Sequence, residues 1–327
     1  MPLLDMPLEQ LRQYTGSSPC PADMEAYWAR ALRELEATDP APTCVPAHFQ
    51  VPGYQCSHLY FNGVGGGRIH CKLVQPLRLR EKAPALLQFH GYGGDGGAWT
   101  DKLAWAAMGF VVCAMDVRGQ GGLSQDHVVT DGPTQSGHII RGLSDGDPAH
   151  LFYRQVFLDT AMAARVVMAL ENVDADNVSA MGGSQGGALA IACAALVPSL
   201  RRAAVCFPFL CDYQRVWEMD MAERAYGELK DYFRKFDPTH SREKEIFTRL
   251  GYIDLQNLAG RIRAQVQMHT GLMDNVCPPS TQFAMYNKIV SPKEVVVYPD
   301  YGHEELKGAA DRMAQFLLYG LADAEQK

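Results

Sequence analysis

The 327-residue sequence predicts an α/β fold with a mostly parallel central sheet and helices on both faces. Three observations lead to this prediction. Short, continuously apolar runs recur along the chain, helical segments separate several of them, and one run enters a glycine-rich turn. Runs of this kind are typical of strands covered on both faces, which occur in parallel sheets flanked by helices. We expect residues 1–327 to form one domain, because the chain is long enough to bury a sizeable core.

The first 45 residues predict an N-terminal helical extension. The stretch "SPCPADMEAYWARALRELEAT" has apolar residues at helical spacing, among them Trp28 and Leu32, and the proline-rich "DPAPTCVP" marks its end. Two β-rich segments follow at 48–61 and 68–74. They are joined across "NGVGGGR", which favours an antiparallel hairpin.

Six apolar runs are the expected strands of the parallel sheet: 85–90, 110–116, 178–184, 203–209, 264–271 and 294–300. Amphipathic crossover helices are expected at 155–170 and 187–196. The stretch from about 212 to 258 breaks this pattern, because it is charged and aromatic and holds no strand-like run. We interpret it as a helical insertion over the carboxyl ends of the strands, where ligands bind in open α/β sheets. A decoration remote from the site is the alternative.

Composition excludes several classes of function. A net charge of -7 argues against nucleic acid or an anionic membrane as a partner, because both require clustered Lys and Arg. The N-terminus has no signal-peptide pattern, and no apolar run reaches the roughly 18–20 residues of a membrane-spanning helix. The nine cysteines are an odd number without a CxxC pair, so we expect neither a disulfide framework nor a zinc site. These features favour a cytoplasmic location.

The turn Gly182-Gly183-Ser184-Gln185-Gly186 matches G-x-S-x-G and lies between an expected strand and an expected helix. This context predicts a nucleophile elbow and therefore the α/β-hydrolase fold. Residues two positions from the serine need almost no side chain in such a turn, and Gly187 would let the helix pack close to the sheet. A phosphate-binding loop is the alternative, but the Gly-Lys pair that precedes the serine of a P-loop is missing.

A serine nucleophile needs a base and an acid, which follow it along the chain in this fold. We expect His303 to be the base, because it follows the last strand. His240 is interpreted as a solvated loop residue and His269 as a packed residue of the sheet. Asp274 follows the penultimate strand and is the expected acid. Asp300 ends the last strand only three residues before the base, and it fits a turn or cap residue better.

The oxyanion hole is expected to use two backbone N–H groups, one from Gln185 and one from Tyr92 in the loop "HGYGGDGG" at 90–97. His90 precedes the serine and is interpreted as a brace that holds this loop by a hydrogen bond. An aromatic run after the next strand either walls the acyl pocket or belongs to the core: Phe207, Pro208 and Phe209.

These residues together resemble the acetyl xylan esterase and cephalosporin-C deacetylase family, carbohydrate esterase family seven. The resemblance rests on "YTGSSPCPADMEAYW", "FHGYGG", "RGQ" at 118–120, "GGSQGG", "GLMDNVCPPST" and "HE" at 303–304. It implies that Ser184, Asp274 and His303 form the triad, with Tyr92 and Gln185 as oxyanion donors. Arg118-Gly119-Gln120 would shape the site loop.

The resemblance also implies a reaction and an assembly. The expected activity removes acetyl groups from short xylo-oligosaccharides and from other small acetylated molecules, without a metal or organic cofactor. The expected assembly is a ring-shaped homohexamer. A peptidase or amidase on the same fold is the alternative enzyme, although prolyl-peptidase relatives carry a large extra domain that is not seen here. A non-catalytic binding protein is the alternative of another class, and such proteins lose a triad member.

Overall fold

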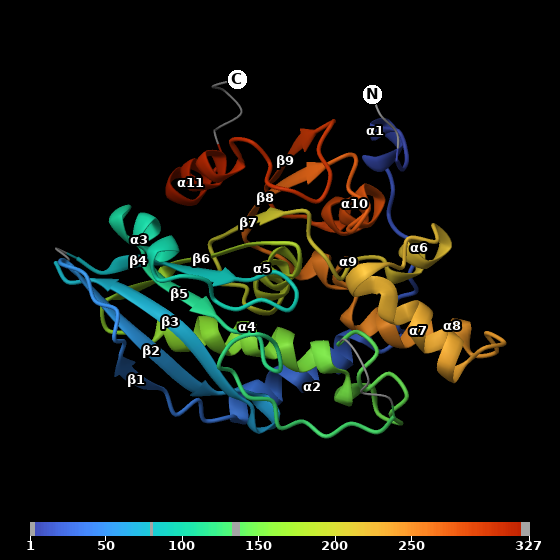
Figure 1. The fold of residues 1–327 in the computed structure, drawn as a ribbon, viewed down its shortest axis with the longest axis horizontal. Helices are drawn as coiled ribbons and strands as arrows, with labels where there is room; N and C mark the ends of the chain where they lie inside the picture. The colour runs from blue at the N-terminus through green and yellow to red at the C-terminus, as the bar shows by residue number, and fades with distance from the viewer. Residues whose placement is uncertain (1–3, 79–80, 133–137, 322–327) are drawn as a thin grey trace.

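The computed structural model describes residues 4–78, 81–132 and 138–321, and the other positions of the predicted domain lie outside the described residues. These residues form a nine-stranded sheet in the order β1-β2-β3-β5-β4-β6-β7-β8-β9 (Figure 1). The strands are β1 Thr43–Pro46, β2 Tyr54–Asn62, β3 Arg68–Pro76, β4 Ala83–Phe89, β5 Val111–Met115, β6 Val173–Gly183, β7 Arg202–Cys206, β8 Gln265–Gly271 and β9 Lys293–Tyr298.

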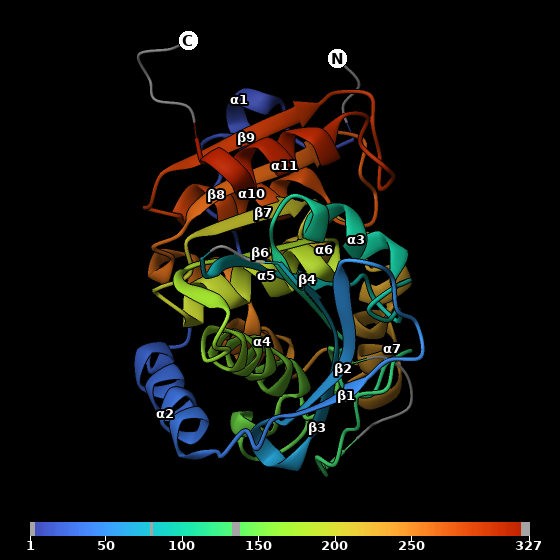
Figure 2. The ribbon, with the colours of Figure 1, turned by 90° about the vertical axis from the view of Figure 1, so that its left-hand side faces the viewer.

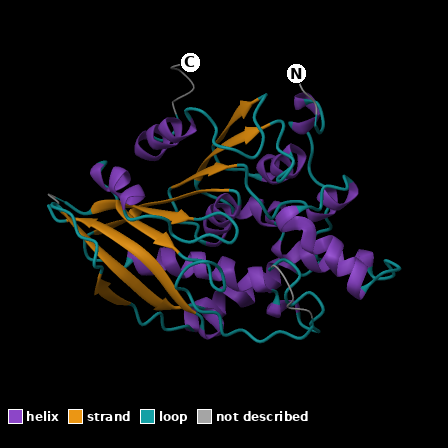
Figure 3. Cartoon of the chain, in the orientation of Figure 1, coloured by secondary structure: helices purple, strands orange, loops and turns teal. Residues whose placement is uncertain are grey.

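Helices cover both faces of the sheet (Figure 2 and Figure 3). Helices α4, α5 and α10 pack on one face with α2 outside α4, and α3 and α11 pack on the other face. The helices are α1 Leu8–Leu11, α2 Met24–Ala37, α3 Thr100–Ala107, α4 Phe152–Met168, α5 Gln185–Leu196, α6 Tyr213–Glu218, α7 Gly227–Phe236, α8 Glu243–Leu250, α9 Leu255–Leu258, α10 Pro279–Lys288 and α11 Ala309–Tyr319. Short 3₁₀ turns lie at η1 Val64–Gly66, η2 Pro148–His150, η3 Arg224–Tyr226, η4 Gly251–Ile253 and η5 Ala259–Arg261.

The predicted α/β fold is confirmed, and the sheet is parallel where the apolar runs predict it. The pairs from β5 through β4 to β9 are all parallel, while β1, β2, β3 and β5 pair antiparallel. Side chains alternate along β4, so that Leu87 and Phe89 face the α5 side and Leu86 faces the α3 and α11 side. A strand with both faces buried has no polar face, which explains the unbroken apolar runs.

Three local predictions are wrong in detail. Strand β1 lies within "DPAPTCVP", which predicted only a boundary; its four residues are all exposed, so no apolar pattern marks them. The run 203–209 is a strand only to Cys206, because Phe207 adopts a φ of 34° and turns the chain away. The crossover helix α5 is not amphipathic, since it is apolar on every side and all of its residues are buried.

The stretch 212–258 forms α6, α7, α8 and α9 with two 3₁₀ turns between them. These helices lie on the side of the molecule toward which β4 and β5 point (Figure 1). Helix α7 contacts the loop after β4 through Glu228, which accepts a hydrogen bond of 2.6 Å from the hydroxyl of Tyr92. The insertion therefore touches the loop that was expected to hold an oxyanion donor.

The apolar residues of helix α2 pack against the core of the same chain. Trp28 is fully buried, its indole lies 6.1 Å from the ring of Phe157, and its Nε1–H donates to the carbonyl of Tyr252 at 3.0 Å. Leu32 is half-buried and packs against the same core. Trp28 completes the core of the protomer, so its side chain is not available to a second copy.

The segment before α2 clamps the insertion to the rest of the fold. The buried carboxylate of Asp212 accepts hydrogen bonds from the hydroxyl of Tyr14 at 2.8 Å and from the N–H of Ser18 at 2.8 Å. Asp5 accepts a hydrogen bond of 2.7 Å from the N–H of Ser280 at the start of α10. The N-terminal residues therefore join two elements that lie late in the chain.

All nine cysteines are free thiols, and Cys113 and Cys193 are buried as small apolar residues. Within the described ranges, no helix combines the length and apolarity that crossing a bilayer requires.

Candidate active site

Ser184 stands at the sharp turn between β6 and α5, with φ 55° and ψ -122°. A non-glycine residue in this region stores roughly 1–3 kcal/mol of strain, and the surrounding structure must hold it there. The Ser184 N–H donates to the Cys206 carbonyl at 3.0 Å, and the Ser184 carbonyl accepts from the N–H groups of Ala188 and Phe209 at 3.0 and 3.1 Å. These backbone bonds fix the serine at the top of the sheet.

Three of the four neighbouring glycines allow the close backbone approach that this turn needs. A Cβ at Gly186 would collide with the carbonyl of Phe89, and one at Gly182 would collide with the backbone of Gly186. A Cβ at Gly187 would lie 2.9 Å from the carbonyl oxygen of Cys206. The structure thus explains the glycine spacing around the serine.

The three residues predicted as the triad are brought together by three separate loops. His303, between β9 and α11, has its Nδ1 2.8 Å from Asp274 Oδ2 and its Nε2 3.1 Å from Ser184 Oγ. Asp274 is fully buried, and its other oxygen accepts hydrogen bonds of 2.8 Å from the N–H groups of Val276 and Cys277. The carboxylate therefore faces the Nδ1–H of the imidazole, which leaves Nε2 free to accept the serine proton.

The other residues that were weighed as the acid or the base are not part of the triad. Asp300 is exposed in the turn after β9. His240 is exposed and lies 3.0 Å from Glu243. His269 is buried within β8, where burial lowers the pKa of its imidazole to about 4 and its Nδ1 lies 3.2 Å from the hydroxyl of Tyr298.

The two predicted oxyanion donors come from the elbow itself and from the loop after β4. Gln185 is the first residue of α5, and N–H groups in a first helical turn have no acceptor within the helix. Tyr92 follows β4 in the glycine-rich loop. The Gln185 side chain exchanges hydrogen bonds of 2.7 and 2.9 Å with Gln120, whose Oε1 also accepts the N–H of Gly93 at 2.9 Å. Gln120 thus links the loop to the elbow helix.

The rest of the "RGQ" motif is structural. Arg118 is fully buried and donates two hydrogen bonds of 2.6 Å to Asp159 and one of 3.0 Å to the carbonyl of Val64. His90 has its Nδ1 2.7 Å from the Gly91 carbonyl, and its Nε2 accepts the N–H of Val117 at 2.9 Å. Burial lowers the pKa of His90, which favours the neutral imidazole that this pair of contacts requires. The prediction that His90 braces the loop is confirmed.

The aromatic run divides between site and core. The ring of Phe207 is half-buried and lies 4.5 Å from the ring of His303, so Phe207 borders the site. Pro208 is buried, and Phe209 is buried between the rings of Tyr92 at 6.1 Å and Tyr226 at 4.4 Å. Phe207 thus lies beside the predicted base, while Phe209 packs in the core.

The sequence did not predict the role of Asp116, which anchors the loop at 90–97 through hydrogen bonds. Asp116 accepts hydrogen bonds from His70 Nδ1 at 2.6 Å, from the N–H of Gly96 at 2.6 Å and from the N–H of Leu123 at 2.8 Å. His58 Nδ1 in turn lies 2.8 Å from His70 Nε2. Burial alone would raise the pKa of Asp116, but these donors lower it to about 2. No sequence signal joins these residues, because they come from strands β2 and β3, the loop after β4 and the loop after β5.

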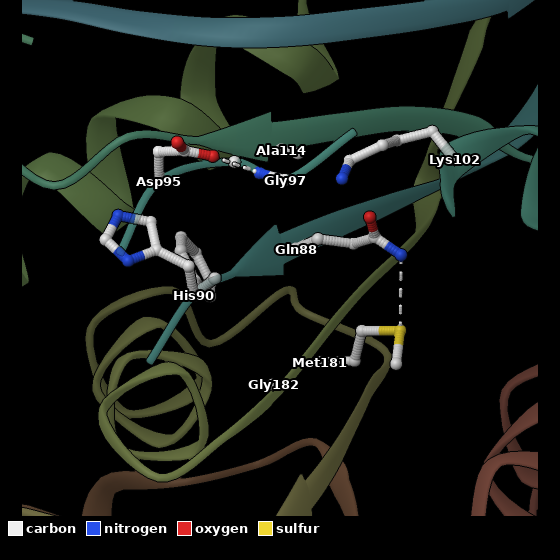
Figure 4. A pocket seen from close by; sticks show the side chains of 10 residues that line it. Gln88, His90, Asp95, Gly97, Lys102, Ala114, Met181 and Gly182 are labelled. Atoms are coloured by element: carbon white, nitrogen blue, oxygen red, sulfur yellow. Dashed lines mark hydrogen bonds between the residues drawn. The ribbon is translucent and has the colours of Figure 1, made fainter. Parts of the chain in front are cut away.

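A pocket of about 240 Å³ lies beneath the loop at 90–97, beside Gly182 of the elbow (Figure 4). The ammonium group of Lys102 and the carboxamide of Gln88 lie on its wall, and the Gln88 Nε2 donates to the sulfur of Met181 at 3.6 Å. Residues from the two ends of this loop, His90 and 95–97, therefore line an open pocket.

The sequence and fold match those of known esterases. The model of the acetyl xylan esterase (AXE1) family matches residues 1–319. The solved structure of acetyl xylan esterase 1 from Thermoanaerobacterium sp. JW/SL YS485 is 53% identical, with a TM-score of 0.95 over 98% of this chain and 100% of that one. The acetyl xylan esterase from Paenibacillus sp. R4 is 36% identical, with a TM-score of 0.92 over 97% of this chain and 100% of that one.

Another relative is a longer protein than this chain. Acetyl esterase Axe7A from Xylanibacter ruminicola is 28% identical over 305 residues, which cover 90% of this chain but 65% of that protein. Because the family model spans nearly the whole sequence and the solved relatives share the whole fold, the chain belongs to the acetyl xylan esterase family, a family of carboxylic ester hydrolases.

Proposed function

We propose that the protein is a serine esterase that removes acetyl groups from small acetylated substrates through an acyl-enzyme. One observation carries the proposal: a single imidazole lies 3.1 Å from Ser184 Oγ and 2.8 Å from the buried carboxylate of Asp274. This is the nucleophile–base–acid arrangement of serine hydrolases. Membership of a family of esterases supports an ester rather than an amide as the bond that is cleaved.

In the proposed reaction, Ser184 Oγ attacks the acetyl carbonyl carbon while His303 Nε2 takes the hydroxyl proton. The negative charge that forms on the carbonyl oxygen is stabilised by the N–H groups of Gln185 and Tyr92. His303 then gives its proton to the departing alcohol oxygen, which leaves an acetylated serine. Water attacks this ester by the same route and releases acetate, while Asp274 stabilises the imidazolium in both halves.

The substrates that we propose are acetylated xylo-oligosaccharides and cephalosporin C-like acetyl esters. Comparing initial rates on both with rates on simple acetyl esters tests the proposal. A fluorophosphonate probe tests the mechanism separately, because only an activated serine reacts with it, and labelling should map to Ser184. A protein that binds acetylated molecules without hydrolysing them would remain unlabelled.

We expect a steep preference for short acyl chains. The ring of Phe207 beside His303 limits the space next to the reacting atoms, so nitrophenyl acetate should be hydrolysed faster than nitrophenyl butyrate. A series of nitrophenyl esters from acetyl to octanoyl, compared by kcat/KM, measures this preference. Rates that rise with chain length would contradict it.

We also propose a homohexamer located in the cytoplasm. The family resemblance supports the hexamer, whereas the buried Trp28 does not. Light scattering at micromolar concentration should give about six times the chain mass of 36.1 kDa. A mass equal to that of a single chain would refute the assembly.

A further inference from the structure

Glu228 of α7 is a buried carboxylate, 5% exposed, that accepts hydrogen bonds from two other segments of the chain. Its Oε1 accepts the hydroxyl of Tyr92 at 2.6 Å and the N–H of His138 at 2.9 Å. Its Oε2 accepts the N–H groups of Ile139 and Ile140 at 2.7 and 3.2 Å. One side chain of the insertion therefore joins the loop after β4 to the segment 138–140.

The charge of Glu228 is balanced by hydrogen bonds. Among the residues that the structure describes, no Lys, Arg or His side chain forms an ion pair with it. Burial raises the pKa of its carboxyl group, and the hydrogen bonds from Tyr92 and the three backbone N–H groups oppose that rise. A buried carboxylate left without such donors is costly, so the contact with Tyr92 is held firmly.

Tyr92 is the one residue of the stretch 91–94 that has a side chain. Its three neighbours in that stretch are glycines, which leave the backbone free to adopt many conformations. The ring of Tyr92 packs against those of His138 and Phe209, with centroids 5.8 and 6.1 Å away, and its hydroxyl ends on Glu228. The peptide that carries the Tyr92 N–H is also held at its carbonyl, the Gly91 oxygen, which lies 2.7 Å from His90 Nδ1 and accepts the N–H of Gly94 at 3.1 Å. The contact with Glu228 adds a further anchor through the Tyr92 side chain.

We propose that Glu228 is a positioning residue that sets the backbone N–H of Tyr92 in the oxyanion hole. The proposal rests on the function proposed above, because it concerns a donor that acts only during acyl transfer. An oxyanion donor must lie within hydrogen-bond distance of the developing charge, and its rigidity determines how much it stabilises that charge. The insertion would then contribute to catalysis without touching the substrate.

The test uses Glu228→Gln and Tyr92→Phe, each of which weakens or removes the contact while leaving the backbone N–H in place. Deleting an oxyanion donor costs about 10²–10³ in kcat. Misplacing one should cost less, so we expect kcat on nitrophenyl acetate to fall roughly 10- to 100-fold, with KM changed less than about threefold. Because both variants break the same contact, the double variant should lose little more than either single one.

Tyr252→Phe is the matched control. Tyr252 lies in the same stretch 212–258, and its hydroxyl donates to the carboxylate of Asp23, so the variant also loses a tyrosine–carboxylate contact of the insertion. Its kcat should stay close to that of the unchanged protein. Rates are normalised to the fraction of Ser184 labelled by a fluorophosphonate, which removes any loss due to unfolded protein.

A second measurement separates positioning from general structural damage. Affinity for a boronic acid, which forms a tetrahedral adduct on the serine, should fall in parallel with kcat/KM, whereas KM for the ester should not. The proposal is overturned if normalised kcat in Tyr92→Phe and Glu228→Gln stays above about a third of the original value, or if the control loses as much. If the unchanged protein neither labels nor hydrolyses acetyl esters, the proposed function fails instead.

Discussion

Replacing Ser184 by alanine should leave the fold intact and lower kcat by about 10⁴–10⁶. The hydroxyl is the proposed nucleophile, and removing a member of such a triad leaves only the contribution of the oxyanion hole and substrate binding. The three backbone hydrogen bonds at this turn use the N–H and carbonyl of residue 184, which alanine retains. Steady-state kinetics on nitrophenyl acetate, together with circular dichroism, measures both effects.

Traces of another esterase would set the lowest activity that can be measured for Ser184→Ala. The variant is therefore purified in parallel with the unchanged protein, and both are treated with a fluorophosphonate. Labelling should disappear in Ser184→Ala. A variant that keeps more than about a tenth of the activity would rule out the proposed mechanism.

Asp274→Asn should lower kcat by about 10⁴, which is on the order of 5 kcal/mol of transition-state stabilisation. The structure gives a specific reason. One oxygen of Asp274 accepts the N–H groups of Val276 and Cys277, so an asparagine would keep its oxygen there and turn its NH₂ toward His303 Nδ1. The imidazole would then need to accept at Nδ1 and carry its proton on Nε2, which prevents it from taking the proton of Ser184.

Asp300→Asn is the matched control, since Asp300 is an exposed carboxylate three residues before the same histidine. It should cost at most roughly 0.5–1.5 kcal/mol of folding stability and little rate. Kinetics at neutral pH and circular dichroism of both variants distinguish the two acids. If Asp300→Asn were inactive and Asp274→Asn active, the assignment of the acid would be wrong.

The sequence predicted those features whose cause is local. Gly182 is required by a backbone contact with Gly186 within the turn, and the turn lies between an apolar strand and a helix, so the local sequence indicates the elbow. The parallel strands are visible because burial on both faces removes polar residues from them. Strand β1 escaped prediction for the opposite reason: its side chains are exposed, and its pairing with β2 leaves no trace in its composition.

Contacts between distant segments could not be predicted. Glu228 is 136 positions from Tyr92, and no pattern within the charged insertion distinguishes it from its solvated neighbours. Likewise, the helical spacing that includes Trp28 correctly predicts a buried stripe, but it does not say whether the stripe packs on the same chain or on another copy. Only the contact with Tyr252 answers that question.

The clamp formed by the N-terminal segment has a consequence for synthesis on the ribosome. Asp5 pairs with Ser280, 275 residues later, and Tyr14 pairs with Asp212, 198 residues later. At about 5–20 residues per second, the first of these partners emerges roughly 14–55 s after the residue that it must meet. Asp5 and Tyr14 must therefore wait unpaired after they leave the ribosome, and the contacts that hold the insertion to the N-terminal segment close late in folding.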